Sequence, residues 1–206
     1  MNKKIIILIL FALLLSQSLA YAQEAKQETS AQVSDWGKLS EEYFAKNDYD
    51  GFYSVLKVVP EPTAEVQYYL ALTRQKNIDF WNQTKNWEGV FDKAAAFKKE
   101  ILGDLDFAQN LLKNEPILSW KIKYLRWRRA REDDPDSAEG FFNDFINTAQ
   151  DGPGSAVALE VIRSIADELT LLEDKNFARR LYEIYARKLI ASDLSKGELK
   201  ERAVLF

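Results

Sequence analysis

The chain has 206 residues, 47% hydrophobic and 29% charged, which is enough apolar material for a folded core. It contains no cysteine and no histidine, which excludes cysteine nucleophiles, histidine-based triads and the usual zinc and haem sites. With 28 basic and 32 acidic residues the formal charge is -4, so no overall basic field points to a nucleic-acid partner. We expect no metal and no cofactor.

Residues 1–22 have the three parts of a secretory signal peptide. Two lysines are followed by an apolar run over residues 5–15 and by the small-residue pattern Ala-Tyr-Ala at 20–22. The run is about half of the ~20 residues that a transmembrane helix needs, so cleavage before Gln23 is favoured over an uncleaved anchor, which stays the alternative. The sequence therefore predicts an exported protein, periplasmic or extracellular, with no membrane span in the mature chain.

Residues 23–34 contain no aromatic side chain and are predicted to form a flexible leader. From residue 35 to 206, apolar residues recur every three or four positions, which indicates an all-α fold. Polar, Pro or Gly interruptions divide this region into ten predicted helices. The interruptions lie at 47–50, 60–62, 77–79, 103–104, 114–116, 133–135, 151–154, 173–175 and 192–195. The break at 151–154 is the sharpest and is where the array would divide if it has two parts.

Several ends of these predicted helices carry local signals. Asp134 is expected to accept free backbone amides of a helix that has Pro135 at its first position. Ser195 and Glu198 have the spacing of a capping box, yet the helix that they open stops on apolar residues, so we expect the chain to continue or this end to dock on something. For residues 52–59, rich in Val and aromatic residues, a β-strand is the alternative to helix.

The ten helices pair into about five antiparallel hairpins, and 172 residues shared by five pairs give about 34 residues per pair. The first pair contains the motif W-x-x-L-S-x-x-Y, followed by a tyrosine after the turn. The signature residues are Trp36, Leu39, Ser40, Tyr43 and Tyr49. This motif resembles the opening of a tetratricopeptide repeat, although Phe52 stands where that family has a small residue and the later pairs match only as helix pairs. The resemblance implies an α-solenoid whose concave groove holds a peptide or a helix of another protein.

Acidic side chains form three groupings that bear on chemistry. Asp48 and Asp50 suggest a calcium loop, but lysines stand at its first and twelfth ligand positions, so an inter-helix turn is favoured. The acids at 133–136 are better explained as helix capping than as a metal site. Close pairs such as Asp104 and Asp106 could hydrolyse a glycosidic bond. The alternative function is therefore a helical domain of, or associated with, a carboxylate-based envelope glycan hydrolase, with its catalysis either on carboxylates of this chain or in a missing C-terminal part.

Residues 119–131 combine six basic and three aromatic side chains in one predicted helix. Trp120, Tyr124 and Trp127 fall on one stripe of this helix, which favours a face that packs in the core. The alkyl parts of the basic side chains would lie beside this face, and the acids at 132–134 would neutralise their charges. The alternative is a surface patch for an anionic partner such as a phospholipid head group, an acidic glycan or an acidic peptide. The candidate patch consists of Lys121, Lys123, Arg126, Arg128 and Arg129.

A second aromatic concentration comprises Phe80, Trp81, Trp87, Phe91 and Phe97. Helical spacing places Phe80, Trp87 and Phe91 on one face, which favours packing against a neighbouring hairpin, and a carbohydrate-stacking platform is the alternative. The preferred overall interpretation is an exported helical-repeat binding or assembly module of the cell envelope. It is expected to bind a protein or peptide, without catalysis and without a nucleic-acid partner.

Overall fold

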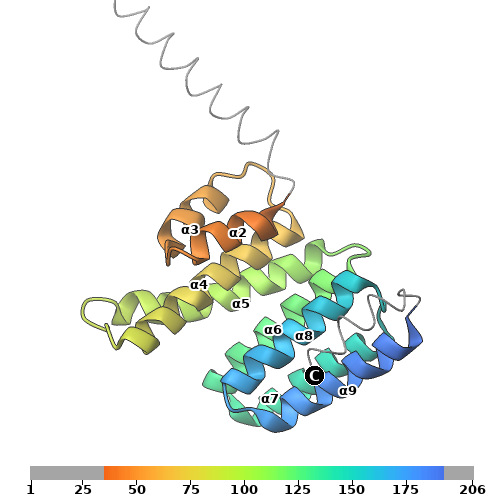
Figure 1. Ribbon diagram of the computed structural model, residues 1–206. Coiled ribbons are helices and arrows are strands. Elements are labelled where there is room, and N and C mark those ends of the chain that lie inside the picture. The colour runs from red at the N-terminus through yellow and green to blue at the C-terminus, as the bar shows by residue number, and fades with distance from the viewer. Residues whose placement is uncertain (1–34, 193–206) are drawn as a thin grey trace, which may run out of the picture. The chain divides into compact units, whose positions relative to one another are not determined.

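The computed structural model describes residues 35–192, and every regular element in this part of the chain is an α-helix (Figure 1). The prediction of an all-α fold is therefore confirmed. The predicted signal peptide, the leader and the helix expected after residue 195, with its capping box, lie outside the described residues. The chain divides into two compact units between Pro62 and Thr63.

The first unit contains helices α2 (Trp36–Phe44) and α3 (Tyr49–Lys57). Each begins with an aspartate cap. The Asp35 carboxylate accepts a hydrogen bond from the Lys38 amide at 2.9 Å, and the Asp48 carboxylate accepts one from the Gly51 amide at 3.0 Å. The segment considered as a calcium loop is thus the start of α3, and residues 52–57 of the segment considered as a strand are helical.

The repeat signature lies on both helices of this first unit. Its members are buried (Trp36, Ser40 and Tyr49) or partly buried (Leu39 and Tyr43). The hydroxyl of Ser40 donates to the Gly37 carbonyl at 2.6 Å, and the Tyr43 ring lies 5.5 Å from the ring of Phe52. Phe52 is fully buried, so the position at which the tetratricopeptide pattern has a small residue is filled here by an aromatic core side chain.

The second unit contains six described helices: α4 (Ala64–Thr84), α5 (Phe91–Leu111), α6 (Pro116–Asp133), α7 (Pro135–Asp151), α8 (Ala156–Leu171) and α9 (Lys175–Ala191). Consecutive helices pack as pairs, α4 with α5, α6 with α7 and α8 with α9. Helix α6 also contacts α4 and α5, and α7 contacts α9. The two helices of a pair are consecutive in the chain and lie side by side, as Figure 1 shows most clearly for α4 and α5.

Two predicted breaks are wrong, because α4 continues through residues 77–79 and α5 through residues 103–104. Asn77 is buried and Asp79 pairs with an arginine of another helix, so tertiary contacts outweigh the local turn preference of these residues. The chain turns instead at residues 85–90. The other predicted breaks up to residue 175 coincide with inter-helix turns, so residues 35–192 form eight helices in four pairs.

The start of α7 shows one more difference from the predicted capping. Asp134 is the residue before the helix and Pro135 is its first residue, as the sequence indicates. The carboxylate of Asp134, however, accepts from the Ser137 hydroxyl at 2.5 Å and not from a backbone amide. The Ser137 hydroxyl thus occupies the Asp134 carboxylate, which the sequence predicted to accept from the backbone amides of the helix.

A hydrophobic core is shared by α6, α7, α8 and α9. Trp120 and Trp127 are fully buried in it and Tyr124 is nearly so, which confirms the predicted aromatic stripe. The turn at residues 151–154 lies against this core, since a Cβ atom added to Gly152 would lie 2.1 Å from a ring carbon of Trp120. The core therefore continues on both sides of that turn.

Candidate functional site

Helix α6 carries all the cations of the candidate anionic-partner patch. The patch residues are Lys121, Lys123, Arg126, Arg128 and Arg129. Because α6 contacts α4, α5 and α7, its side chains point toward several neighbours. Consequently, the structure does not bring the five cations together on one exposed surface.

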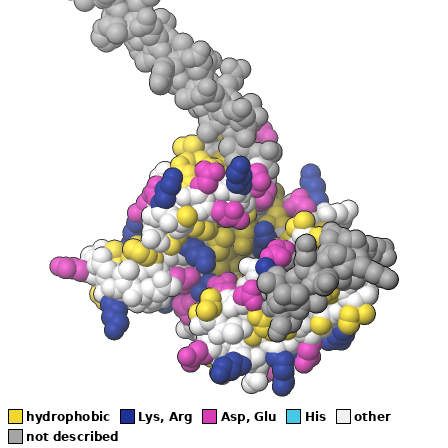
Figure 2. Space-filling model, in the orientation of Figure 1, with side chains coloured by type: hydrophobic (Ala, Val, Ile, Leu, Met, Phe, Trp, Pro, Cys, Tyr) yellow, Lys and Arg dark blue, Asp and Glu magenta, His cyan; other side chains and the backbone are white. Residues whose placement is uncertain are grey.

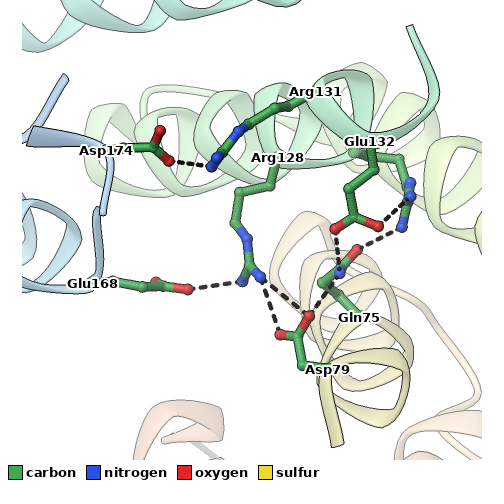
Figure 3. A network of polar contacts seen from close by, with 8 residues as sticks. Gln75, Asp79, Arg128, Arg131, Glu132, Glu168 and Asp174 are labelled. Atoms are coloured by element: carbon green, nitrogen blue, oxygen red, sulfur yellow. Dashed lines mark hydrogen bonds and ion pairs between the residues drawn. The ribbon is translucent and has the colours of Figure 1, made fainter. Parts of the chain in front are cut away.

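Arg128 lies in the interior, and its side chain is 9% exposed. Its Nη2 atom is 3.1 Å from both carboxylate oxygens of Asp79 on α4, and its Nη1 atom is 2.7 Å from Glu168 Oε1 on α8 (Figure 3). Burial alone would lower the pKa of Arg128, but the two carboxylates outweigh it and the pKa is raised. One guanidinium thus ties α6 to both α4 and α8.

Arg129 is completely buried and has partners on two helices. Its guanidinium is 2.6 Å from Glu132 and 2.6 Å from Asp133, both on α6, and it donates to the amide oxygen of Gln75 on α4 at 3.2 Å. The Gln75 amide in turn donates to Asp79 at 3.0 Å, so the contacts of the two arginines form one network (Figure 3). Glu132 and Asp133 are among the acids that the sequence placed after the cations of α6.

Two further patch cations pair with the flanking helices. The Lys123 ammonium donates to Asp144 at 2.9 Å and to Thr148 at 2.7 Å, both on α7. Arg126 donates to Asp106 on α5 at 2.5 Å, and the two side chains are 28% and 68% exposed. Such exposed pairs contribute about 0 to 1 kcal/mol each to stability. Arg126 is therefore held more loosely than the two buried arginines.

The remaining cations of α6 also have neighbours within the second unit. The Lys121 ammonium lies 6.0 Å from the ring centroid of Tyr68 on α4, and Arg131 pairs with Asp174 before α9. Burial raises the pKa values of Tyr68 and of Tyr124, whose hydroxyls lie close to the Arg128 network. The structure thus makes α6 the polar centre of the unit, with a charge or ring contact for each of its cations.

A groove of about 280 Å³ opens between the α4/α5 pair and the α6/α7 pair. Three helices line this groove, which we call the seam between the two pairs. The lining residues are Leu102 and Asp106 on α5, Arg126, Arg129, Ala130 and Asp133 on α6, and Asp134 and Phe141 at α7. Leu102 is 40% exposed and Phe141 is 36% exposed. The groove thus combines two accessible apolar side chains with the Arg126–Asp106 ion pair.

Leu102 and Phe141 were not among the residues that the sequence singled out. Their apolar character is visible in the sequence, but each lies beside the buried stripe of its helix, at Ile101 and Phe142 respectively. An apolar residue next to such a stripe is a weak signal, because single exposed hydrophobic residues are common. Only the packing of α5 and of α7 against α6 places these two side chains in one groove.

The carboxylate pair considered for glycan hydrolysis is engaged in ion pairs. Asp104 pairs with Arg74 of α4, which also contacts Glu100 at 2.7 Å, and Asp106 pairs with Arg126 of α6. Within residues 35–192, no three acidic side chains converge in a way that could hold a metal ion. Both acids of this candidate pair thus act as partners of arginines from neighbouring helices.

The second aromatic cluster differs from its prediction. Trp87 lies in the turn at 85–90 and Phe91 is the first residue of α5, so the two do not share a helical face. Their rings still contact each other, with centroids 5.4 Å apart and planes 20° apart. Gly89, with φ of 72°, is the sequence signal that could have located this turn.

Comparison of the chain with protein-family models, curated proteins and solved structures gives no match. No helix within the described ranges is both long and apolar enough to cross a bilayer. The geometry of the helix pairs and their groove therefore carries the functional proposal.

Proposed function

We propose that the chain is an exported helical-repeat protein of the cell envelope that binds a peptide segment of a partner protein and performs no catalysis. In this proposal the helix pairs form a tetratricopeptide-like α-solenoid. Three features support it: the repeat signature in α2 and α3, the packing of the later helices as consecutive pairs, and the contacts of α6 with both helices of the preceding pair.

The observation that carries the proposal is the groove between two consecutive helix pairs. Stacked helix pairs form extended concave surfaces, and grooves on such surfaces can hold a peptide or a helix of a partner. Leu102 and Phe141 supply accessible apolar contacts in this seam. An apolar anchor of the partner peptide would lie between them, as is usual at protein–protein hot spots.

Charge at the groove gives the peptide an orientation. Arg126 and Arg129 are the patch cations that line the groove. Arg129 is fully buried, whereas the pair of Arg126 with Asp106 is exposed enough to open. A partner carboxylate can then bind Arg126 while a partner lysine or arginine binds Asp106. The buried Arg128 and Arg129 hold the helices together and do not contact the partner.

The test is a binding measurement with a partner captured from envelope extract and then purified. Isothermal titration compares the wild type with Leu102→Glu and Phe141→Ala, and Phe107→Ala is the matched control. Phe107 is a 46% exposed phenylalanine on α5 that does not line the groove.

We expect the two groove variants to weaken binding at least about tenfold, since the loss of a hot-spot side chain costs about 2 kcal/mol or more. The control should bind like the wild type. Equal affinity for all four proteins would contradict a partner site in this groove. Release of sugar from envelope glycan by the purified protein would instead support the hydrolase alternative.

A further inference from the structure

The turn at residues 85–90 lies at the end of the longest helix pair of the second unit. Helices α4 and α5 have 21 residues each, whereas α6 to α9 have 16 to 18. In Figure 1 the loop end of α4 and α5 extends beyond the ends of α6 to α9. This hairpin tip is therefore accessible to a large ligand.

A series of contacting aromatic rings extends from the buried part of the hairpin to this tip. Phe97 and Trp81 are buried and stacked, with centroids 5.8 Å apart and planes 19° apart. The Trp81 ring meets Trp87 at 6.3 Å, and Trp87 stacks on Phe91 at 5.4 Å with planes 20° apart. The outer pair is thus held in one orientation by the buried pair, which lowers the entropy lost on binding a ligand.

The outer pair of rings is partly accessible to solvent. Phe91 is 66% exposed, and Trp87 is partly buried. The other four of the five tryptophans, all within the described residues, are buried. A rigid aromatic pair left accessible at a protruding end marks an interaction site, because exposed aromatic area lowers solubility.

Charges and amides around the two rings indicate the chemistry of the ligand. Lys85 and Lys93 are balanced by Glu88 and Asp92, all four exposed. Exposed amide side chains also lie near the turn, at Asn82, Gln83 and Asn86. Figure 2 shows acidic, basic and apolar side chains side by side on this hairpin end. Amides and carboxylates are hydrogen-bond partners for hydroxyl groups, and the balanced charge favours a neutral ligand.

We propose that the hairpin tip binds a neutral glycan chain, whose sugar rings stack on Trp87 and Phe91. The C–H groups on the face of such a ring lie against the negative face of an aromatic ring, and the surrounding polar side chains bind its hydroxyls. This site is separate from the groove, and it does not depend on the proposed peptide partner.

Two other occupants fit the tip less well. A membrane surface with anionic lipids attracts clusters of lysine and arginine, whereas the charges here cancel. A stable protein partner buries about 800 Å² on each side, and two aromatic side chains supply about 300 to 500 Å² at most. A glycan chain needs only a small platform for each sugar, because successive units can bind several copies of the protein.

The experiment measures retention of the purified protein on insoluble chitin, a neutral glycan, together with titration by the hexamer of N-acetylglucosamine. Wild-type tryptophan emission should change on titration, because Trp87 is the one tryptophan that is not buried. Phe91→Ala and Trp87→Ala should bind about five- to tenfold more weakly. Trp87→Phe should keep most of the affinity, since the ring remains.

Ile190→Ala is the matched control, because this residue is 83% exposed on α9, away from the tip. It should bind the glycan like the wild type. Phe91→Ala removes an exposed ring, so unchanged thermal unfolding of this variant separates lost binding from lost folding. The proposal is overturned if the wild type binds neither probe, or if Phe91→Ala binds as tightly as the wild type. It is also overturned if the aromatic variants lose binding only to vesicles of phosphatidylglycerol and phosphatidylethanolamine.

Discussion

Replacing Arg128 with methionine removes the single guanidinium that joins α4, α6 and α8. Methionine fills a similar length of space with an unbranched apolar side chain, so the main change is the loss of charge and hydrogen bonds. Asp79 and Glu168 each lose an ion pair, and the two carboxylates then face each other across the vacated position. Both effects destabilise the contact between the α4/α5 pair and the later helices.

The magnitude follows from the exposure of the three side chains. Removing one partner of a fully buried ion pair costs about 3 to 5 kcal/mol. Arg128 is 9% exposed, but Asp79 is 18% and Glu168 is 32% exposed, so water can partly solvate the carboxylates that remain. We therefore expect Arg128→Met to lower the free energy of unfolding by about 2 to 4 kcal/mol.

Urea denaturation followed by circular dichroism measures this change. Arg126→Met is the control, because its ion pair with Asp106 is largely exposed and should contribute less than ~1 kcal/mol. Combining Arg128→Met with Glu168→Gln should cost less than the sum of the two single changes, since they remove a shared contact. If Arg128→Met costs no more than Arg126→Met, the network does not hold the helix pairs together and the reasoning is refuted.

Three further substitutions test other parts of the fold. Burial raises the pKa of Tyr68 above its ordinary value of 10.0. The stability that the neutral phenol contributes is therefore intact below pH ~10 and is lost as the pH rises further. In urea titrations from pH 10 to 11, the wild type should lose stability more steeply than Tyr68→Phe, by up to about 1.4 kcal/mol per pH unit. Gly152→Ala places a Cβ 2.1 Å from the Trp120 ring and should lower stability by about 1 to 3 kcal/mol. Gly140→Ala, in open space on α7, should raise it by about 0.5 to 1 kcal/mol. Equal shifts of the unfolding temperature would show that the Trp120 ring can move aside at no cost. Trp36→Ala should cost about 3 to 5 kcal/mol because the indole is 8% exposed, and a loss below ~1 kcal/mol in thermal unfolding would count against its place in the repeat core.

The sequence predicts the helices well where the signal lies within one helix. Trp120, Tyr124 and Trp127 share a stripe at helical spacing, and that stripe is buried as predicted. The prediction from sequence fails at Asn77 and at Gly103, where residues of low helix propensity lie in the middle of long helices. Contacts with other helices stabilise those stretches, and such contacts cannot be inferred from local propensity.

In the candidate site, too, contacts within one helix can be predicted from the sequence, whereas contacts between helices cannot. The pairing of Arg129 with Glu132 and Asp133 follows from spacings of three and four residues on one helix. Arg128, by contrast, pairs with Asp79, 49 residues earlier, and with Glu168, 40 residues later. These partners depend on how the helix pairs pack, so a run of cations in the sequence could equally indicate an external partner or an internal network.

The most direct test of the central claim, that a partner peptide binds in the seam between helix pairs, is site-specific photo-crosslinking in cells that export the protein. A photoreactive phenylalanine analogue replaces Phe141 in the groove, or Phe107 outside it. The account predicts a discrete adduct with a partner protein from position 141, which disappears when Leu102→Glu is added, and none from position 107. Equal adducts from both positions, or an adduct at 141 that persists with Leu102→Glu, would contradict it.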